Sequence, residues 1–476
     1  MSYETVIGLE VHAQTLTQSK IFCGCSTTFG APANAQVCPV CLGLPGSLPV
    51  LNRRVVDLCI RAGLAIHCTI APFARFARKN YFYPDLPKGY QISMYELPLA
   101  EHGHLEIAVH GSPKRIGILR IHMEEDAGKN LHEGIVGASH VDLNRAGVPL
   151  LEIVSDPDMR SPEEAIAYLK ALREILIYAE VSDGDMEKGN FRCDANISLR
   201  LHGADKFGTR VEIKNLNSFR FIQKALEYEQ RRQAALLDDG KPVTQETRLW
   251  DVKAGATQSM RSKEEAHDYR YFPDPDLVPL QVDAAWIDVI AATLPEMPDA
   301  KRARFVQQYA LSMYDTTVLT GTRAVADFFE QTTARYPHPK TVSNWIMGEL
   351  LREMNRDGEG ADTIRIHPDQ MAALLQRIDD GTLNAAGAKT AFAQMYQTGD
   401  SAETVIRALN LTQLNDANAL GAMIDAALAD YPKELARYRA GEVKLFGFLV
   451  GQVMKRSAGS ANPAKINALL KERLEG

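Results

Sequence analysis

Long apolar runs are missing from this 476-residue sequence, and none reaches the roughly 18 residues that a membrane-spanning helix needs. Positive charge is not in excess either, because 53 Lys and Arg stand against 60 Asp and Glu, for a formal net charge of −7. A simple polycationic nucleic-acid binder is therefore excluded, although a local basic patch is compatible with this total. The first four residues lack the basic and apolar regions of a secretory signal peptide. We expect a cytoplasmic, soluble protein with no membrane partner.

Several catalytic and nucleotide-binding motifs are also absent. The sequence contains no G-x-x-x-x-G-K-[ST], no G-x-G-x-x-G before a helix, no H-E-x-x-H and no G-x-S-x-G. These absences argue against a P-loop NTPase, a Rossmann oxidoreductase, a zincin protease and a serine hydrolase with a nucleophile elbow. Chemistry by a positioned metal ion and fixed charges fits the remaining residues better than covalent catalysis.

Length and hydrophobic periodicity predict about three domains and an α+β fold class. From residue 3 to about 280, apolar residues alternate with period 2, which predicts a largely antiparallel sheet. Two helices interrupt this pattern: one starts at Ser161-Pro162-Glu163-Glu164, and the other runs from about Phe219 to before Gly240. A proline-rich stretch over 273–298 marks a boundary, and the sequence beyond it is helical in pattern. Ser401 begins a further helix after a second break.

Cysteine is scarce, with seven residues, and the odd number argues against a complete disulfide framework. Four of them form two short-spaced pairs, Cys23 with Cys25 and Cys38 with Cys41. Four thiolates in such pairs can converge tetrahedrally on Zn²⁺. The pattern predicts a structural zinc site that its own four ligands close, and a cluster of small buried cysteines is the alternative.

Mixed-charge strand faces mark the candidate chemistry. In the opening strand Glu10 and His12 project from one face, about 7 Å apart, so both can reach one cation. A solvated strand face is the alternative for this pair alone. The same design recurs in two later strands, whose polar faces carry Asp194, Asn196, Ser198, Arg200, Arg210, Glu212 and Lys214. Oxygen ligands with a histidine suit Mg²⁺ or Mn²⁺, and interspersed Arg and Lys suit a phosphorylated substrate.

A further segment, 119–129, adds acidic and imidazole groups. Alternation places His122 and Glu124 on its polar face and Glu125 on its apolar side. A carboxylate on the apolar side must be paired, bound to metal or beyond the end of the strand. The aromatic, proline-rich loop over 80–90 contains Lys88 and follows Lys79. Its composition suits nucleotide or base stacking, and a packed surface loop is the alternative.

Nine motifs carry a resemblance to a known family. In chain order they read GLEVH, CGC…CPVCLGLPGSLPVLN, KNYFYPDLPKGYQIS, HMEEDAGK, DLNRAGVPLLEIVS, NFRCDANISLR, EIKNLNS, MRSKEEAHDYRYFPDPDL and GQVMKRSAGSANP. Over its whole length the chain resembles the B subunits of the aspartyl/glutamyl-tRNA amidotransferases, the GatB family. The resemblance implies an antiparallel-sheet cradle domain over 1–294, an all-α helical domain over 295–400 and a small YqeY-like helical tail domain over 401–476.

The resemblance also implies an activity. Such a GatB chain works in a heterotrimer with an amidase-type glutaminase A subunit and a small C subunit. It would use ATP and Mg²⁺ (or Mn²⁺) to phosphorylate the side chain of Asp or Glu misattached to tRNA. Ammonia from the glutaminase would then displace phosphate, giving Asn-tRNA(Asn) or Gln-tRNA(Gln). The chain would thus be part of a ligase that forms carbon–nitrogen bonds in protein biosynthesis.

The family's functional residues transfer onto matching positions. The resemblance implies Glu10, His12 and Glu125 as metal ligands, with Glu152, Asp194 and Glu212 as further catalytic candidates on neighbouring strands. Phosphate or ATP would be bound by Lys79, which is also a catalytic candidate, and by Lys88, Arg200 and Lys214. Alternation favours Glu124 over Glu125, so the sequence leaves open which of the two binds metal. The four cysteines match a structural Zn²⁺ site of some family members.

The basic tail is the candidate RNA-binding surface. Residues 431–476 hold nine Lys and Arg against four Asp and Glu, a net charge of +5. Phosphate contacts from such a surface would position tRNA without reading its sequence. The candidates are Lys444, Lys455 and Arg456, and a solvated helix face is the alternative.

Two other functions remain open from the residues alone. A catalytically idle scaffold that binds tRNA would not need Glu10, His12 and Glu125 gathered near Lys79. A stand-alone metal-dependent phosphohydrolase would leave the basic tail and the cysteine cluster unexplained. The sequence does not distinguish Asp-tRNA(Asn) from Glu-tRNA(Gln) as substrate, and it does not reveal the ammonia path or the subunit interfaces.

Overall fold

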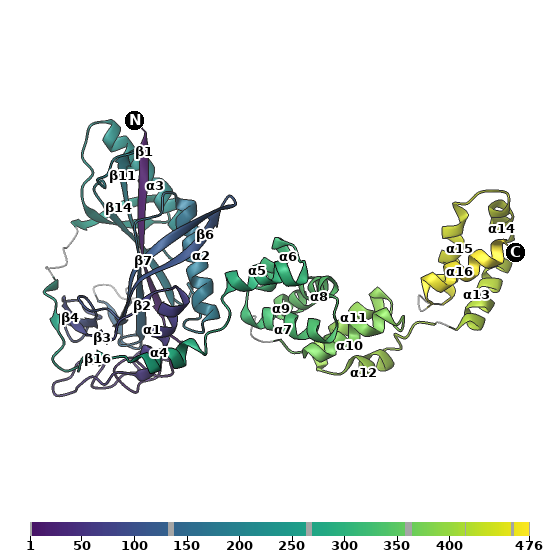
Figure 1. The fold of residues 1–476 in the computed structure, drawn as a ribbon, viewed down its shortest axis with the longest axis horizontal. Coiled ribbons are helices and arrows are strands. Elements are labelled where there is room, and N and C mark those ends of the chain that lie inside the picture. Colours follow the sequence, from purple (N-terminus) through teal and green to yellow (C-terminus); the bar gives the residue numbers. More distant parts are fainter. Residues whose placement is uncertain are drawn as a thin grey trace. The chain divides into compact units, whose positions relative to one another are not determined.

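The structure is a computed structural model that describes residues 2–131, 138–262, 269–357, 364–414, 416–457 and 461–475. Parts of two quoted motifs, residues 263–268 and 458–460, lie outside these ranges. The chain forms two compact units, Met1–Pro298 and Asp299–Gly476. Each is described by itself (Figure 1).

The first unit is built mainly of strands. Its strands are β1 (Tyr3–Gln14), β2 (Thr69–Ile70), β3 (Phe73–Ala74), β4 (Ala77–Asn80), β5 (Tyr90–Ser93), β6 (Ala100–Val109), β7 (Ser112–Glu125), β8 (Lys129–Leu131), β9 (His140–Asp142), β10 (Pro149–Ser155), β11 (Phe191–Leu201), β12 (Val211–Lys214), β13 (Glu246–Asp251), β14 (Ala256–Ser262), β15 (Phe272–Pro273) and β16 (Leu280–Gln281). Its helices are α1 (Arg53–Ala65), α2 (Pro162–Tyr178), α3 (Phe219–Asp238) and α4 (Ala284–Ala291).

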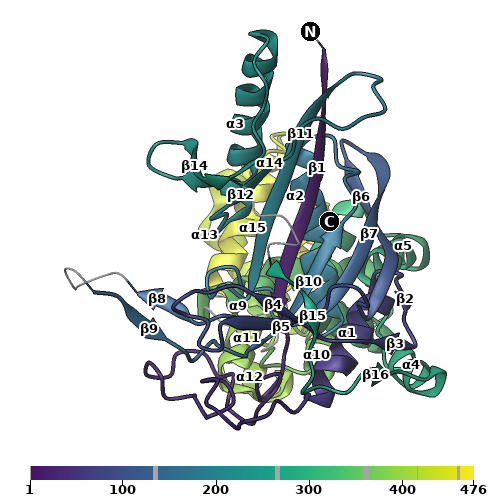
Figure 2. The same cartoon turned by 90° about the vertical axis from the view of Figure 1, so that its left-hand side faces the viewer.

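A nine-stranded sheet in the order β14-β13-β12-β11-β1-β10-β7-β6-β2 organises this unit. Strand β1 lies between β11 and β10, as Figure 2 shows, and pairs antiparallel with both. The other ladders of the sheet are antiparallel too, except for β12 and β13, which run parallel. The predicted α+β class and largely antiparallel sheet are confirmed. A smaller sheet, β15-β4-β5, carries Lys79.

Both predicted helices form where their caps occur. Ser161 caps α2 by accepting a hydrogen bond from the backbone N–H of Glu164, with Pro162 in the first turn. Ser218 caps α3 by accepting from the N–H of Phe221. Because such caps satisfy N–H groups that the first turn leaves free, they fix where each helix begins.

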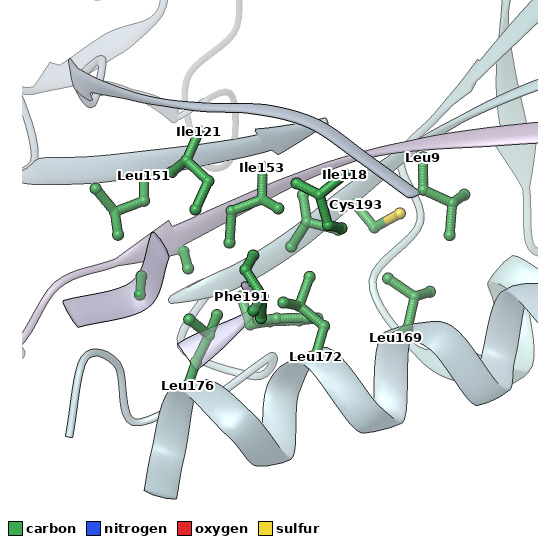
Figure 3. Close-up of a cluster of buried hydrophobic side chains, with 14 of the residues drawn as sticks. Leu9, Ile118, Ile121, Leu151, Ile153, Leu169, Leu172, Leu176, Phe191 and Cys193 are labelled. Carbon is green, nitrogen blue, oxygen red and sulfur yellow. The ribbon is translucent and has the colours of Figure 1, made fainter. Parts of the chain in front are cut away.

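The apolar face of the sheet packs on α2. Figure 3 shows Leu169, Leu172 and Leu176 of the helix against strand residues that include Ile153 and Phe191. Each of these side chains is at most 1% exposed. Because successive strand residues point to opposite faces, burying this set on α2 directs the intervening polar residues to the other side of the sheet.

The second unit is helical over its described residues. Its elements are α5 (Pro298–Tyr309), α6 (Met313–Leu319), α7 (Arg323–Arg335), α8 (Pro339–Trp345), a π-helix (Ile346–Leu350), α9 (Leu351–Asp357), α10 (Pro368–Asp379), α11 (Ala385–Thr398), α12 (Ala402–Ala408), α13 (Ala417–Asp430), α14 (Pro432–Arg439), α15 (Leu445–Arg456) and α16 (Pro463–Glu475). The helix predicted after Ser401 is α12, which that serine caps.

Two separate apolar cores lie in this unit. One extends from Phe305 to Ile406 and the other from Leu420 to Leu474. Helix α12 contributes Ile406 to the first of them, so its apolar contacts join it to the preceding helices. The three-domain division stays a prediction, and these cores favour a second boundary after α12 instead of before it.

Candidate metal and phosphate site

The candidate site lies on the polar face of the central sheet, where β11, β1, β10 and β7 run side by side. The register sets His12 opposite Arg192 on one side and opposite Glu152 on the other, and it sets Glu152 opposite His122. Directly opposed residues on adjacent strands bring their Cβ atoms to about 4.5–5.5 Å. These four side chains therefore form a polar row across four strands.

Three members of this face form a compact cluster of ligand atoms. Nε2 of His12 lies 3.4 Å from Oε1 of Glu124 and 3.5 Å from Oε2 of Glu152. One ligand atom from each of the three residues lies within 4.8 Å of the other two. One imidazole nitrogen and two carboxylate oxygens at this spacing fit a divalent cation such as Mn²⁺ or Mg²⁺. We call His12, Glu124 and Glu152 the carboxylate–imidazole cluster.

His122 supports the cluster from the next strand. Its Nε2 lies 3.0 Å from Oε2 of Glu152, and its Nδ1 is buried without a hydrogen-bond partner. In metal sites, carboxylate ligands are themselves held by hydrogen bonds from residues that do not bind the metal. His122 is therefore suited to orient Glu152.

The electrostatics show what burial and like charge do to these groups. Burial raises the pKa of Glu124, and the nearby charge of Glu152 raises it further. Burial alone would lower the pKa of His12, but the hydrogen bond and charge of Glu152 and the charge of Glu124 raise it to about 9. Two crowded carboxylates thus favour a positive charge between them, and either an imidazolium or a metal ion can supply that charge.

Glu125 follows Glu124 in sequence, but its carboxylate is not part of the cluster. Its Oε2 accepts a hydrogen bond of 2.6 Å from Nζ of Lys88, and its Oε1 accepts one of 2.8 Å from the N–H of Ile92. Of the three alternatives given for a carboxylate on the apolar side (paired, bound to metal or beyond the end of the strand), the structure shows pairing. Among the described residues, the cluster of carboxylates and histidine that could hold a metal contains Glu124 and not the expected Glu10 and Glu125.

Glu10 belongs to a neighbouring acidic group. Its Oε1 accepts a hydrogen bond of 2.8 Å from the amide of Asn196, and it lies opposite Asp194 in the sheet. Burial raises the pKa of Glu10, as do the charges of Glu152, Glu212 and Asp194. Glu10 therefore lies between the cluster and the acidic residues of β11 and β12.

Lys214 neutralises that acidic group. Its Nζ lies 2.6 Å from Oδ2 of Asp194 and 3.5 Å from Oε1 of Glu212. The other carboxylate oxygen of Glu212 accepts a 2.7 Å hydrogen bond from the hydroxyl of Thr247. The structure thus brings three of the predicted residues, Asp194, Glu212 and Lys214, into one connected set.

Lys79 enters from the small sheet and is surrounded by tyrosines. Its Nζ lies 4.8 Å from the ring centre of Tyr269 and 5.9 Å from that of Tyr81. Burial alone would lower the pKa of Lys79, but Tyr271 and the charges of Glu124 and Glu152 raise it. Lys79 is therefore held as an ammonium beside the carboxylate–imidazole cluster, with aromatic faces that favour the cation.

The cysteine cluster is a separate site. All seven cysteines lie in the described part of the chain and all are free thiols. Cys23, Cys25, Cys38 and Cys41 bring their sulfur atoms within 4.8 Å of one another. A hydrogen bond from Cys23 lowers the pKa of Cys41 to about 4, while the pKa of Cys23 rises because of the same bond. Four sulfur ligands at this spacing could hold a metal ion such as Zn²⁺.

Comparisons with known proteins support the resemblance that the motifs carry. Residues 5–288 match the family described as "GatB/GatE catalytic domain", and residues 327–474 match the GatB-YqeY family, described as "GatB domain". A protein of Syntrophotalea carbinolica is 57% identical over 474 residues, which cover 100% of this chain and 99% of that protein. One of Thermodesulfovibrio yellowstonii is 56% identical over 470 residues, 99% of each chain. Each is named as the B subunit of an aspartyl/glutamyl-tRNA(Asn/Gln) amidotransferase.

The chain belongs to the GatB family. The resemblance predicted from the motifs is thereby confirmed, and so is the presence of a YqeY-type domain. A relative in Halorhodospira halophila, with the same name, is 55% identical over 478 residues and matches end to end. A name of this kind places GatB chains in a multi-subunit amidotransferase. In the described part of this chain no helix has the length and apolarity to cross a membrane.

In this GatB chain, Arg200 lies apart from the cluster, and three further predicted residues belong to the second unit. Nη2 of Arg200 lies 2.5 Å from Oε2 of Glu4. Arg200 is eight residues further along β11 than Arg192, the residue opposite His12, so the backbones of Arg200 and Arg192 are roughly 26 Å apart. We therefore exclude Arg200 from the proposed phosphate site. Lys444, Lys455 and Arg456 lie in the second unit as exposed residues, and Arg456 forms an ion pair with Asp430. Their role in binding RNA stays a prediction.

Motif transfer missed three residues of the site. Alternation of polar and apolar residues had already placed two of them, Glu124 and His122, on the polar face of their strand. Arg192, opposite His12, shares the alternation that places Asp194 on the polar face, but its ion pair with Asp126 joins segments that are distant in sequence. Asp126 is 4% exposed, and its Oδ1 lies 2.9 Å from Nη2 of Arg192. This ion pair holds the guanidinium of Arg192 at the edge of the cluster.

Proposed function

We propose that this GatB-family chain activates the side-chain carboxylate of Asp or Glu attached to tRNA, and then amidates it. ATP would donate its γ-phosphoryl group, and ammonia would come from a glutaminase A subunit in a heterotrimer with a small C subunit. The products would be Asn-tRNA(Asn), Gln-tRNA(Gln) or both. The names of the relatives support the tRNA substrate and the amidotransferase reaction for those relatives.

The observation that carries the proposal is the carboxylate–imidazole cluster beside Lys79. Three ligand atoms within 4.8 Å of one another, on a face that also carries lysines, suit a metal ion and the phosphates it accompanies. A scaffold with no catalytic role has no need for carboxylates whose charges are crowded in this way. That crowding raises the pKa of Glu124 and Glu10 after burial has raised it already.

We propose His12, Glu124 and Glu152 as the residues that would hold Mg²⁺ or Mn²⁺. When bound there, such a cation would neutralise charge on phosphate oxygens. His122 would keep the carboxylate of Glu152 directed to the cluster through their 3.0 Å contact. Glu10, Asp194 and Glu212 would extend the same negative surface across β1, β11 and β12.

The lysines divide between the two acidic groups. Lys79 faces the cluster and would offset the charge that builds up on the transferred phosphoryl group. Lys214 would offset phosphate charge at the acidic group of β11 and β12, where its Nζ lies 2.6 Å from Oδ2 of Asp194. Lys88 is bound by Glu125, so it would reach a phosphate only by leaving that partner.

The proposed reaction has two steps. A side-chain carboxylate oxygen attacks the γ-phosphorus of ATP, the bond to the β-phosphate oxygen breaks, and ADP leaves with that electron pair. Ammonia then attacks the carbonyl carbon of the resulting acyl phosphate, and the carbon–oxygen bond breaks to release phosphate. The nitrogen loses a proton to give the amide. The first step is needed because a carboxylate is a poor acyl electrophile.

The remaining predicted roles complete the proposal. The four cysteines would bind Zn²⁺ and fix the loop that holds them, without taking part in the reaction. Lys444, Lys455 and Arg456 would contact tRNA phosphates from the C-terminal helices. The chain would divide into a cradle domain, a helical domain and a tail domain.

The test is phosphate release in the presence of charged tRNA. The chain, co-expressed with its two proposed partner subunits, is mixed with Mg²⁺, ATP and tRNA charged with Asp or Glu. We expect phosphate release that requires the charged tRNA and stops when the tRNA is uncharged. Release without tRNA would favour a stand-alone hydrolase. Tight tRNA binding with no release would favour the scaffold.

A further inference from the structure

A basic groove lies on the other side of the sheet from the carboxylate–imidazole cluster. It is a cavity of about 460 Å³ between α3 and the turn that joins β13 to β14. Helix α3 packs on the sheet through Ile222, Ala225 and Leu226, which belong to the same apolar core as α2. The groove is thus separate from the proposed phosphoryl-transfer site.

Three cations line this groove, and among the described residues none of them has an ion-pair partner. They are Arg220, Lys224 and Arg231, all exposed on α3. The same helix does pair its inward cation, because Arg232 lies 2.8 Å from Oε2 of Glu229. The acidic residue at the groove, Glu227, accepts a 2.9 Å hydrogen bond from Gln223. The groove therefore holds three cations against one carboxylate, which leaves an excess of positive charge.

The indole N–H of Trp250, like these cations, has no partner among the residues that the structure describes. Trp250 lines the groove and is 3% exposed, and its indole N–H is buried without a hydrogen-bond partner. The ring centre of Trp250 lies 6.3 Å from that of Tyr228 in an edge-on arrangement. A buried donor without an acceptor is destabilising, and an anionic oxygen that reached it from the groove would remove that cost.

The cations follow one side of the helix. Positions 220, 224 and 231 are separated by four and seven residues, which places them on a common stripe about 16 Å long. A line of this length fits an extended polyanion better than a single phosphate group. The first turn of α3 contains no acidic residue, so the helix dipole adds to the positive end of the stripe.

We propose that this groove binds the phosphate backbone of an RNA strand. The inference rests on the proposed function, in which the substrate is a tRNA, and it adds a contact surface on the first unit. Arg220, Lys224 and Arg231 would contact successive phosphates, and the indole N–H of Trp250 would donate to a phosphate oxygen. Such contacts position the RNA without reading its sequence.

The test is tRNA binding, at several salt concentrations, by the full-length chain co-expressed with its two proposed partner subunits. The triple variant Arg220→Gln, Lys224→Gln, Arg231→Gln is compared with a control that removes the same charge, Lys170→Gln, Lys206→Gln, Lys241→Gln, from exposed positions elsewhere on this unit. Fluorescence anisotropy with uncharged tRNA reports the affinity. We expect the groove variant to lose affinity at least about tenfold at 0.1 M salt and the magnitude of its log K versus log salt slope to fall by about 3. We expect the control to change less than about threefold. Equal losses in both variants, or no loss in the groove variant, would overturn the proposal.

Trp250→Phe removes the donor and keeps most of the ring. We expect several-fold weaker tRNA binding with an unchanged unfolding temperature, and unchanged binding would remove the indole from the proposal. If the groove variant instead loses its partner subunits on purification and binds tRNA normally, the groove takes an acidic protein segment and the RNA proposal is wrong. If charged tRNA gives no phosphate release with the unmutated complex while the groove variant still loses tRNA binding, the proposed function fails and the groove stands.

Discussion

Glu124 lies with its Oε1 3.4 Å from Nε2 of His12, although the two residues sit on strands that do not pair with each other. Strand β10 lies between β1 and β7, and its Glu152 contacts both histidines of the polar row. The metal site proposed for this chain therefore depends on the register of three strands at once.

Exchanging Glu124 and Glu125 separately for glutamine tests which carboxylate serves the cluster. We expect Glu124→Gln to lower Mn²⁺ affinity by at least about tenfold, because it removes a ligand oxygen. Glu125→Gln is the matched control, since its carboxylate is bound to Lys88 and the N–H of Ile92. Calorimetric titration with Mn²⁺ measures both. The reverse order of effects would show that Glu125 is the ligand.

Removing the imidazole or the nearby carboxylate of β1 separates catalysis from binding. We expect His12→Ala and Glu10→Ala to bind tRNA as the unmutated chain does, because neither residue is among those proposed to contact tRNA phosphates. Phosphoryl transfer should fall below detection for His12→Ala. Filter binding and phosphate release are measured on the same preparations. An equal loss of tRNA binding would count against the metal assignment.

The Lys88–Glu125 pair predicts a strong coupling in stability. Both side chains are largely buried, at 11% and 5% exposure. Lys88→Met would leave an uncompensated carboxylate, which costs roughly 3–5 kcal/mol, while the double variant with Glu125→Gln should recover much of that loss. Denaturant unfolding of the two single variants and the double variant gives the coupling energy. Additive effects would mean that the two charges do not stabilise each other.

The cysteine cluster predicts a link between zinc content and stability. We expect Cys38→Ser to reduce bound zinc and, for a loss of about 2 kcal/mol, to lower the melting temperature by roughly 4–8 °C. Chelation of the unmutated chain should have the same effect, and added Zn²⁺ should reverse it. A melting curve that stays unchanged while zinc is lost would show that the metal does not stabilise the loop.

Local sequence rules predicted much of this fold. The capped starts at Ser161, Ser218 and Ser401 are satisfied within one helical turn, so short-range pattern is enough to find them. Strand faces followed from alternation for the same reason. The order of the nine strands and the parallel pairing of β12 with β13 could not be predicted, because strand neighbours are chosen by contacts between distant segments.

The site shows the same division. Alternation identified Glu124 and His122, because a strand that buries Ile121 and Met123 must turn these residues the other way. The distance between Arg200 and Arg192 follows from the rise per residue of a strand, but the register that sets Arg192 opposite His12 does not follow from any local rule. The ion pair of Arg192 with Asp126 joins two segments that are distant in sequence, so it could not be predicted either.

The most direct test of phosphoryl transfer follows an oxygen atom. The side-chain carboxylate of the amino acid on tRNA is labelled with ¹⁸O, and the complex is supplied with ATP, Mg²⁺ and glutamine. If the carboxylate attacks the γ-phosphorus and the amide then forms, the released phosphate carries ¹⁸O from the side chain. Phosphate that contains no ¹⁸O would show that water and not the carboxylate accepts the phosphoryl group, and it would contradict the account.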